Sequence, residues 1–307
     1  MKCKGIKYGQ EGGGMKKRKI KKAFIYILLT LAASVMVFPI LFTLSNSLMS
    51  GAEIADRYAK TVTPGNWYDP FFSGIHFARI GLIPDFATVR QYVNMLFLRP
   101  DILRYFWNSV MITVPVVLGQ CIISAPAAYA FEQAHWKYKE ALFFVYAVIM
   151  LMPLQVVMVP NYIMANWLNI LDSYLAIILP GIFSPFGVFL IRQQLRSFPK
   201  EYYDAARMDG AEHGSYFLVV VMPAIKPTLA ALSILTFVEY WNMVDQAVVF
   251  IRTEWKEPMS VFLSTLMNQE TSMLFVASVL YMLPALFLFL LGEKSMAHGI
   301  QLSGLKA

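Results

Sequence analysis

The chain has 307 residues, of which 58% are hydrophobic and 15% charged, and its formal net charge is +7. A soluble domain carries about 25% charged residues, so this composition excludes an ordinary soluble enzyme and predicts an all-α polytopic membrane protein. Basic residues on the cytoplasmic side of a membrane explain the positive charge better than nucleic-acid binding does. The cysteines, Cys3 and Cys121, form no disulfide framework and no metal-binding pattern.

Six apolar segments are long enough to cross a bilayer, which takes about 20 residues per helix. The predicted spans are, approximately, residues 23–44, 106–131, 141–167, 174–195, 225–251 and 273–291. Several contain prolines, and neighbouring helices can satisfy the carbonyl groups that a proline leaves free. We therefore expect kinked helices packed in a bundle.

The placement of lysine and arginine predicts that both termini are cytoplasmic, because 18 of the 26 basic residues then lie in cytoplasmic segments. The strongest contribution is the cluster KKRKIKK before the first span. The expected parts are a tail at 1–22, a membrane domain at 23–292 with an extracytoplasmic loop near 45–105 and a cytoplasmic loop near 196–224, and a tail at 293–307.

Two features of the N-terminal region leave alternatives open. The first span could be a cleaved signal peptide, although its apolar run is longer than a signal sequence needs. The polar segment 1–14 differs from the rest of the chain, and we hypothesise that translation begins at Met15 instead of Met1. Further along, residues 87–98 are expected to form a short amphipathic helix before the second span.

The cytoplasmic stretch EYYDAARMDGAEHGSYFLVVVMP, residues 201–223, holds more polar chemistry than a connector needs. Pro199 suits the first turn of a helix, and Glu201 and Asp204 suit its positive N-terminus. Gly210 suits the left-handed residue that ends a helix. We therefore predict a short helix at 200–209, followed by an apolar run that Pro223 and Pro227 break before the fifth span begins.

This helix is too short to be stable alone and has no broad apolar face for its own bundle. A stripe with helical spacing runs along it: Tyr202, Ala205, Ala206 and Asp209. Small side chains flanked by a tyrosine and by carboxylates suit a helix that docks into a groove of a partner protein. An interfacial helix that merely links two spans is the alternative.

The pattern Asp204-Ala205-Ala206, then Gly210, then Pro223 resembles the EAA loop of permease subunits in ABC importers, with aspartate in place of the usual glutamate. Other segments resemble the carbohydrate-uptake, MalG-like branch of that family. They are FPILFTLSNSL, FWNS, PAAYAF, MLMPLQVVMVPNY, EYWNMVDQ and GIQLSGLKA. The resemblance extends over the whole chain.

The resemblance implies that the chain is a non-enzymatic permease in the bacterial cytoplasmic membrane, forming half of a pore for a sugar or oligosaccharide. It implies a second permease, two ATPase subunits that bind ATP and Mg²⁺, and an extracytoplasmic solute-binding protein. The chain has no Gly-rich phosphate loop of its own, so we expect it to bind no cofactor. The residues expected to contact the ATPase are Tyr202, Asp204, Ala205, Ala206, Asp209, Gly210 and Pro223.

A solute pathway is expected at the predicted fifth span. Glu239, Asn242 and Asp245 recur at i, i+3 and i+6, near one face of a helix, and Trp241 adds a ring for stacking on a sugar. Intramembrane carboxylates usually face a cavity or a partner. The alternative is that these groups bond neighbouring helices. Gln155 in the third span is a weaker candidate.

In the resembled family the loop between the last two spans meets the loaded binding protein, which points to Glu254, Trp255 and Pro258. A merely polar loop is the alternative explanation. Two other functions stay open: the same machinery carrying another polar solute, such as a polyamine, glycerophosphodiester or amino acid, and a secondary transporter. The absence of an inverted repeat disfavours the secondary transporter.

Overall fold

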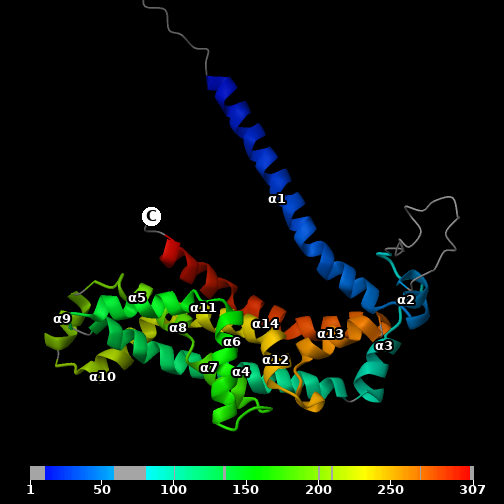
Figure 1. Ribbon diagram of the computed structural model, residues 1–307. Coiled ribbons are helices and arrows are strands. Elements are labelled where there is room, and N and C mark those ends of the chain that lie inside the picture. Colours follow the sequence, from blue (N-terminus) through cyan, green and yellow to red (C-terminus); the bar gives the residue numbers. More distant parts are fainter. Residues whose placement is uncertain are drawn as a thin grey trace, which may run out of the picture. The chain divides into compact units, whose positions relative to one another are not determined.

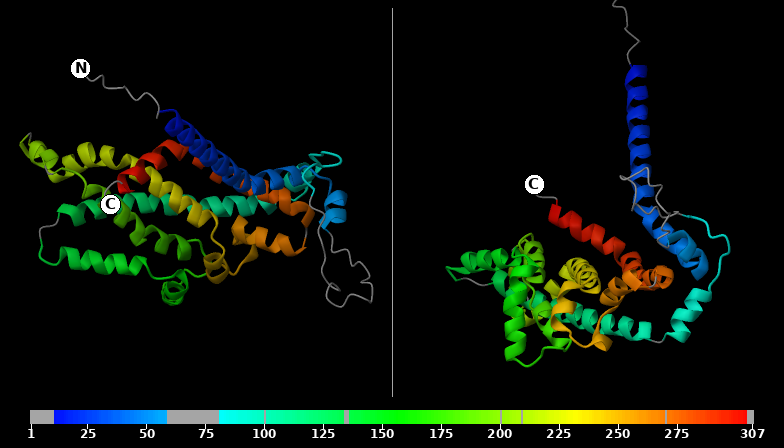
Figure 2. Two further views of the ribbon diagram at one scale, coloured as in Figure 1. Left: turned by 90° about the horizontal axis from the view of Figure 1, so that it is seen from above. Right: turned by 45° about the vertical axis from the view of Figure 1, so that its right-hand side comes forward.

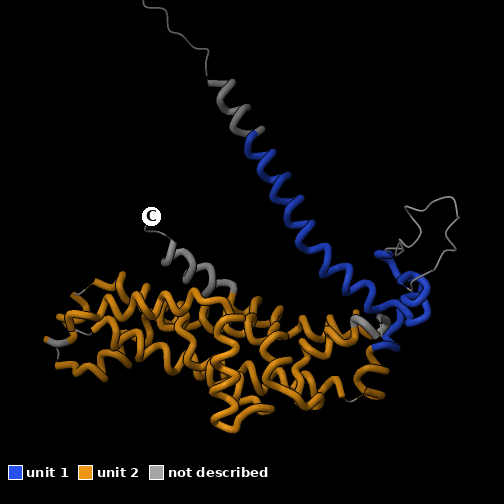
Figure 3. Tube along the Cα trace, in the orientation of Figure 1, with its two compact units in different colours: residues 1–91 blue, residues 92–307 orange. Residues whose placement is uncertain are grey.

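The computed structural model describes residues 11–58, 81–99, 101–133, 136–199, 201–208, 210–269 and 271–304. Every regular element in these ranges is helical, so the predicted all-α fold is confirmed for this part of the chain. The chain divides into two compact units, residues 1–91 and 92–307 (Figure 3). Each unit is described by itself below.

Unit 1 holds α1 (Glu11–Ser47) and α2 (Gly51–Tyr58), which Figure 1 draws in blue. The apolar part of α1 meets the length and hydropathy of a membrane span, as predicted, and its side chains are almost all exposed. Such a surface suits contact with lipid or another membrane protein. The hydroxyl of Tyr58 donates to Asn46 Oδ1 at 2.7 Å and ties α2 to the end of α1.

Unit 2 begins within a short helical segment, α3 (Arg90–Val93) followed by the π-helix η1 (Asn94–Leu98), close to the amphipathic helix predicted at 87–98. The remaining helices are α4 (Asp101–Gln133), α5 (Lys139–Met150), α6 (Leu154–Trp167), α7 (Leu175–Ile182), α8 (Pro185–Leu195), α9 (Glu201–Met208), α10 (His213–Tyr216), η2 (Phe217–Val221), α11 (Met222–Trp241), α12 (Asp245–Phe250), η3 (Glu254–Lys256), α13 (Met259–Gln269) and α14 (Thr271–Gly304). α4 runs along this unit in both views of Figure 2.

Within the described residues, five helical stretches are long and apolar enough to cross a membrane, and a sixth span exists if α5 and α6 count as one. These two helices meet at an angle of 98°, so the prediction of one kinked third span is wrong in its shape. Pro153 is the physical reason, because it has no N–H to donate and disfavours helical geometry at the preceding residue.

The fifth span begins and ends earlier than predicted. α10, η2 and α11 form one continuous helix from His213 to Trp241, so Pro223 and Pro227 do not interrupt it. The π-helical turn precedes these prolines, and the N–H of Met222 donates to Phe217 O, five residues back. At this wider turn the helix accommodates the hydrogen bonds that the two prolines cannot donate.

Asn242 ends the fifth span at a place where no glycine or proline signals a stop. Its Nδ2 donates to Val238 O at 2.8 Å, a bond of the kind by which asparagine competes with helical geometry. The chain then turns through residues 242–244 before α12 begins at Asp245. Glu239, Asn242 and Asp245 therefore do not lie along one face of a single helix, and that part of the prediction is wrong.

Glycines let the helices of unit 2 approach closely. A Cβ added at Gly187 on α8 would lie 2.3 Å from Ser124 Oγ on α4, and one at Gly119 would lie 2.6 Å from a side-chain carbon of Ile182. Small residues at such contacts are typical of helix packing in membranes, as are interhelical hydrogen bonds. Gln120 accepts one of these from Thr236 in the buried contact of α4 with α11.

Candidate functional site

The predicted docking helix is present as α9, at one end of unit 2 beside α10 (Figure 1). Lys200 and Asp209 lie outside the described residues. Gly210 has φ = 79°, the left-handed geometry predicted for the residue after the helix, and no atom lies within 4 Å of a Cβ added there. Backbone conformation alone, and not lack of space, therefore favours glycine at this position.

The two faces of α9 differ from the prediction. Tyr202 and Ala205 are exposed, as a docking surface requires, and Met208 is 89% exposed. Ala206 instead is half-buried and packs against the chain's own core with Tyr203. The prediction that this helix has no broad apolar face for its own bundle therefore missed the contact made by Tyr203 and Ala206, and the predicted stripe is divided between two surfaces.

Aromatic contacts hold α9 to the bundle through Tyr203, which the sequence analysis did not single out. Its ring stacks on His213 at 5.9 Å between centroids and meets Tyr216 edge-on at 5.1 Å. The hydroxyls of Tyr203 and of Tyr129 on α4 lie 3.4 and 3.5 Å from Nδ1 of His213. The spacing of Tyr203 and Ala206, three residues apart, was the available signal for an inward face.

Two other members of the predicted coupling set lie outside this packing. Asp204 is exposed on α9 and Pro223 is exposed within α11. The loop expected at 196–224 is also shorter than predicted, because α10 already begins the next span. The roles of both residues stay predictions.

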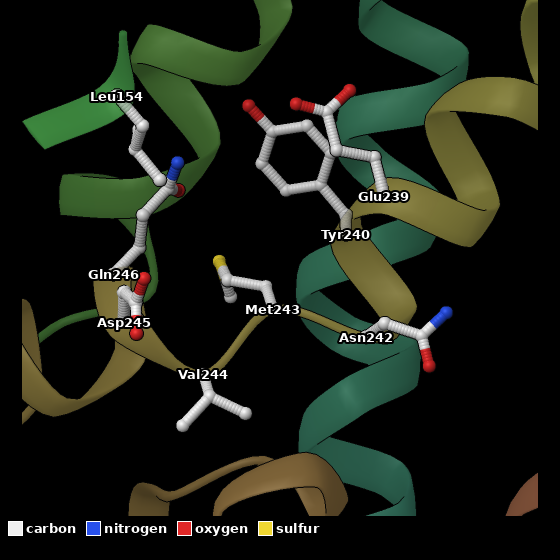
Figure 4. A pocket seen from close by; sticks show the side chains of 8 residues that line it. All are labelled: Leu154, Glu239, Tyr240, Asn242, Met243, Val244, Asp245 and Gln246. Carbon is white, nitrogen blue, oxygen red and sulfur yellow. The ribbon is translucent and has the colours of Figure 1, made fainter.

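A pocket of about 230 Å³ lies where α11 ends and α12 begins (Figure 4). Its lining comprises Leu154, Glu239, Tyr240, Asn242, Met243, Val244, Asp245 and Gln246. The predicted polar residues thus border one pocket, although a break in the helix, rather than a shared helical face, brings them together. Gln155 is exposed on α6 and is not among the lining residues, but its neighbour Leu154 is.

Trp241 does not border this pocket, and its predicted contact with a solute is not supported. The ring is 1% exposed, stacks on Phe237 and on Tyr281, and donates through Nε1 to Tyr281 O at 3.0 Å. The next ring along the chain, Tyr240, lines the pocket instead. Gly181 makes room for it, because an added Cβ would lie 2.7 Å from the Tyr240 hydroxyl.

The polar groups of the pocket differ in their freedom to bind a solute. Asn242 is occupied: its amide donates to Val238 O, and its Oδ1 accepts from the Tyr281 hydroxyl at 2.9 Å. Glu239 and Asp245 have no ion-pair partner among the described residues. Figure 4 shows the Glu239 carboxylate beside the Tyr240 ring, with Asp245 on the far side of Met243.

The loop that precedes α13 is held by side chains of the FWNS motif in α4. Nδ2 of Asn108 donates to the carbonyl oxygens of both Trp255 and Glu257 at 2.8 Å. Oγ of Ser109 accepts from the N–H of Met259 at 2.8 Å. Both side chains are buried, so this motif fixes the path of the loop against α4.

Asp172 holds the same loop from the segment between α6 and α7. It has φ = 57°, and its carboxylate accepts from the backbone N–H groups of Arg252 and Thr253, from Thr253 Oγ1 and from Lys256 Nζ. Hydrogen bonds from Thr253 and Lys256 hold the pKa of Asp172 well below its ordinary value. Nothing in the local pattern around Asp172 had indicated this contact.

The predicted contacts with a binding protein are only partly available on this loop. Glu254 is exposed and Trp255 is 62% exposed, whereas Pro258 is buried and presents no surface. Glu254 and Glu257 also line a pocket of about 260 Å³ beside Tyr105. Burial, and next the charge of Glu254, raise the pKa of Glu257.

Known transport proteins are similar to this chain in sequence or in fold. The chain is 29% identical to the arabinooligosaccharides transport system permease protein AraQ of Halalkalibacterium halodurans, over 66% of this chain and 74% of that one. It is 24% identical to the maltodextrin transport system permease protein MdxG of Bacillus subtilis, over 94% and 98%. One chain in the crystal structure of a bacterial ABC transporter that imports the acidic polysaccharide alginate matches with a TM-score of 0.72, at 21% identity over 94% and 99%.

A family model also matches the chain, over residues 120–296, which is more than half of its length. The matched segment contains α9 and the fifth span. It also contains four carboxylates that line the two pockets, namely Glu239, Asp245, Glu254 and Glu257. The chain therefore belongs to the family of binding-protein-dependent transport system inner membrane components.

Proposed function

We propose that this membrane permease forms half of the pore of an ATP-driven importer for a sugar or oligosaccharide. The observation that carries the proposal is the family match together with relatives named for arabinooligosaccharides and maltodextrin. In this proposal the chain performs no chemical reaction and binds no cofactor. A second permease, which is a different chain, completes the pore, and two ATPase subunits bind ATP and Mg²⁺.

α9 is the segment that contacts the ATPase. Its outer face offers Tyr202, Ala205 and Met208, a small residue between two large exposed ones, which suits insertion into a groove. Its inner face rests on the bundle, so a push on α9 reaches the membrane helices directly. We propose that α9 and both termini lie in the cytoplasm of a bacterium, which the distribution of basic residues supports.

The extracytoplasmic binding protein docks on the loop 252–257, where Glu254 and Trp255 are exposed. Its solute then passes the pocket at the end of α11. Tyr240 supplies a ring edge and a hydroxyl, and Gln246 an amide, which are groups that bind sugar hydroxyls. Glu239 and Asp245 accept hydrogen bonds from hydroxyl groups in the same way.

The charge of this pocket favours a neutral solute over an acidic one. Two carboxylates line it, and no described basic side chain does so. An anionic solute would meet uncompensated repulsion in a site of low dielectric. We therefore propose a neutral oligosaccharide, and an acidic one is the second candidate because of the similarity in fold to the alginate transporter.

The test is reconstitution of the tagged chain with its partner permease, ATPase and binding protein in proteoliposomes. Neutral and acidic oligosaccharides are supplied with the binding protein, and ATP hydrolysis and uptake are measured. We expect a neutral oligosaccharide to stimulate both. Stimulation by acidic oligosaccharides alone would contradict the neutral assignment, and uptake without ATP would contradict the importer.

The docking surface has its own matched pair of variants. Ala205→Glu places a long charged side chain on the outer face of α9 and should abolish co-purification of the ATPase, whereas Ala205→Ser keeps a small side chain and should retain it. Ala206 is a poorer choice because it packs on the chain's own core. Retention of the ATPase by Ala205→Glu would show that α9 does not dock there.

A further inference from the structure

Arg192 on α8 is the only charged residue that is buried among those whose side chains the structure describes, with 0% of its surface exposed. Isolated charges are costly to bury, so a buried arginine needs partners of opposite charge. In the sequence it is one of 26 basic residues, and no local pattern marks it for a role. Neither pocket contains it.

Carboxylates from two other helices meet Arg192. Its Nη2 donates to Glu140 Oε1 on α5 at 2.6 Å. Its Nε lies 3.4 Å from Glu132 Oε2 at the end of α4. The guanidinium also lies 3.8 Å above the ring centroid of Phe143 on α5 and 5.9 Å from that of Phe131 on α4. One side chain thus braces α4, α5 and α8.

The brace is complete on one side only. The ion pair with Glu140 includes a short hydrogen bond. Nε and Nη1 of Arg192 and Oε2 of Glu132 make no hydrogen bond in the described structure. Buried donors and acceptors are nearly always satisfied, so this half-made contact marks a place where a small helix shift would gain hydrogen bonds.

The brace adjoins the surface that carries α9. Phe131, which contacts the guanidinium, packs on the same core cluster as Tyr203 and Ala206 of α9. Glu132 directly follows Phe131 in α4. A displacement of α9 therefore presses on side chains next to the incomplete contact.

We propose that Arg192 is a positioning residue for ATPase coupling, an inference that rests on the proposed function. In the conformation described, Arg192 is paired with Glu140. When the ATPase moves α9, the guanidinium completes its hydrogen bonds to Glu132, and α4, α5 and α8 move as one body with α9. Glu140 therefore pairs with Arg192 in the conformation described, and Glu132 pairs with it in the conformation reached after α9 moves.

The test compares Glu132→Gln with Glu140→Gln in the complete reconstituted importer. If the brace has two states, Glu132→Gln should keep assembly and lower thermal stability less than Glu140→Gln does, because Glu132 makes no hydrogen bond to Arg192 in the conformation described. It should also lower the solute transported per ATP hydrolysed by about tenfold, the effect of about 1.4 kcal/mol. Glu140→Gln should lower thermal stability, because it removes the bond already made. A purely structural role predicts unchanged coupling in Glu132→Gln, and that result overturns the proposal.

A second readout needs no solute and so separates this inference from the sugar assignment. Spin labels are placed at exposed positions 145 on α5 and 201 on α9, with Val145→Cys and Glu201→Cys in a chain whose native cysteines are serine. Their distance should stay the same when vanadate traps ATP in the parent complex, and should change in Glu132→Gln. If vanadate trapping changes the 145–201 distance equally in the parent and in Glu132→Gln, the proposal for Arg192 is overturned. This outcome does not depend on whether any sugar of the panel is transported.

Discussion

Two segments of unit 2 that connect helices are held in opposite ways. The loop 251–259 is fixed by directional hydrogen bonds from Asn108, Ser109 and Asp172 to its backbone. α9 rests on the bundle mainly through the packing of Tyr203 and Ala206. Hydrogen bonds weaken steeply when their geometry changes, whereas apolar contact is non-directional. The loop is therefore a fixed platform, whereas the contacts of α9 tolerate small adjustments as α9 moves together with the bundle.

This difference matches the two tasks in the proposal. A platform that recognises a binding protein benefits from a preformed shape, because little ordering is then needed on binding. A segment that transmits movement has to tolerate displacement. Each of the following variants alters one side of the comparison, in order of decreasing effect.

Replacing Asn108 by alanine should destabilise the protein most, by about 2–4 kcal/mol, because two backbone carbonyl oxygens lose the buried amide that donates to them. Thermal unfolding of the purified protein in detergent measures the change. Asn166→Ala is the matched control, since this asparagine is exposed on α6, and it should stay within about 0.5 kcal/mol. Equal effects of the two would mean that the platform does not depend on Asn108.

Replacing Tyr203 by alanine should release α9 at a cost of about 1–3 kcal/mol, below that of a fully buried ring because Tyr203 is half-buried. Hydrogen exchange should rise at residues 201–208 and stay unchanged in the loop 251–259. Tyr202→Ala is the control on the outer face and should alter neither. Release of α9 by the control variant would contradict the assignment of the two faces.

Replacing Asp172 by asparagine should weaken the platform by about 1–2 kcal/mol, since charged hydrogen bonds to Thr253 and Lys256 are lost. A carboxylate with a lowered pKa stabilises the fold above its ordinary pKa, and this contribution is lost only as pH falls through the lowered value. Amide protection of Arg252 and Thr253, corrected for intrinsic exchange, should thus persist at pH 4 in the parent. Loss of protection near pH 4 would contradict the lowered pKa.

Replacing Gly210 by alanine should have the smallest effect, about 1 kcal/mol, because φ = 79° is unfavourable for a residue with a Cβ but no atom obstructs it. Exchange of the Ala211 amide, which donates to Ala206 O at 2.9 Å, should report fraying at the end of α9. Gly210→Asn should be milder, since asparagine tolerates this region. An alanine variant as protected as the parent would mean that the φ is not needed.

Local signals in the sequence were sufficient for several features. Uninterrupted apolar length predicted most of the spans, because a bilayer demands it. Gly210 predicted the end of α9, because positive φ is a property of one residue. The residues that border the pocket at the end of α11 were also predicted in part, since a carboxylate in an apolar segment stands out regardless of its neighbours.

Other features depended on partners distant in the chain. Asp172 and Lys256 are 84 residues apart, and Arg192 and Glu140 are 52 apart. No local pattern distinguishes Asp172 from a solvated loop residue or Arg192 from a basic residue at a membrane surface. The spacing of Tyr203 and Ala206 permits an inward face, but only the contacts of Tyr203 with His213 and Tyr216 show that α9 uses it.

What the sequence determined by itself is the class of protein and the position of most of its spans, because these follow from hydropathy, length and single-residue backbone preferences. What only the tertiary structure decided is where helices break, which side of α9 is free, and which charges are buried. Those outcomes depend on packing and on hydrogen bonds between segments far apart in the chain, and no local preference of the backbone encodes them.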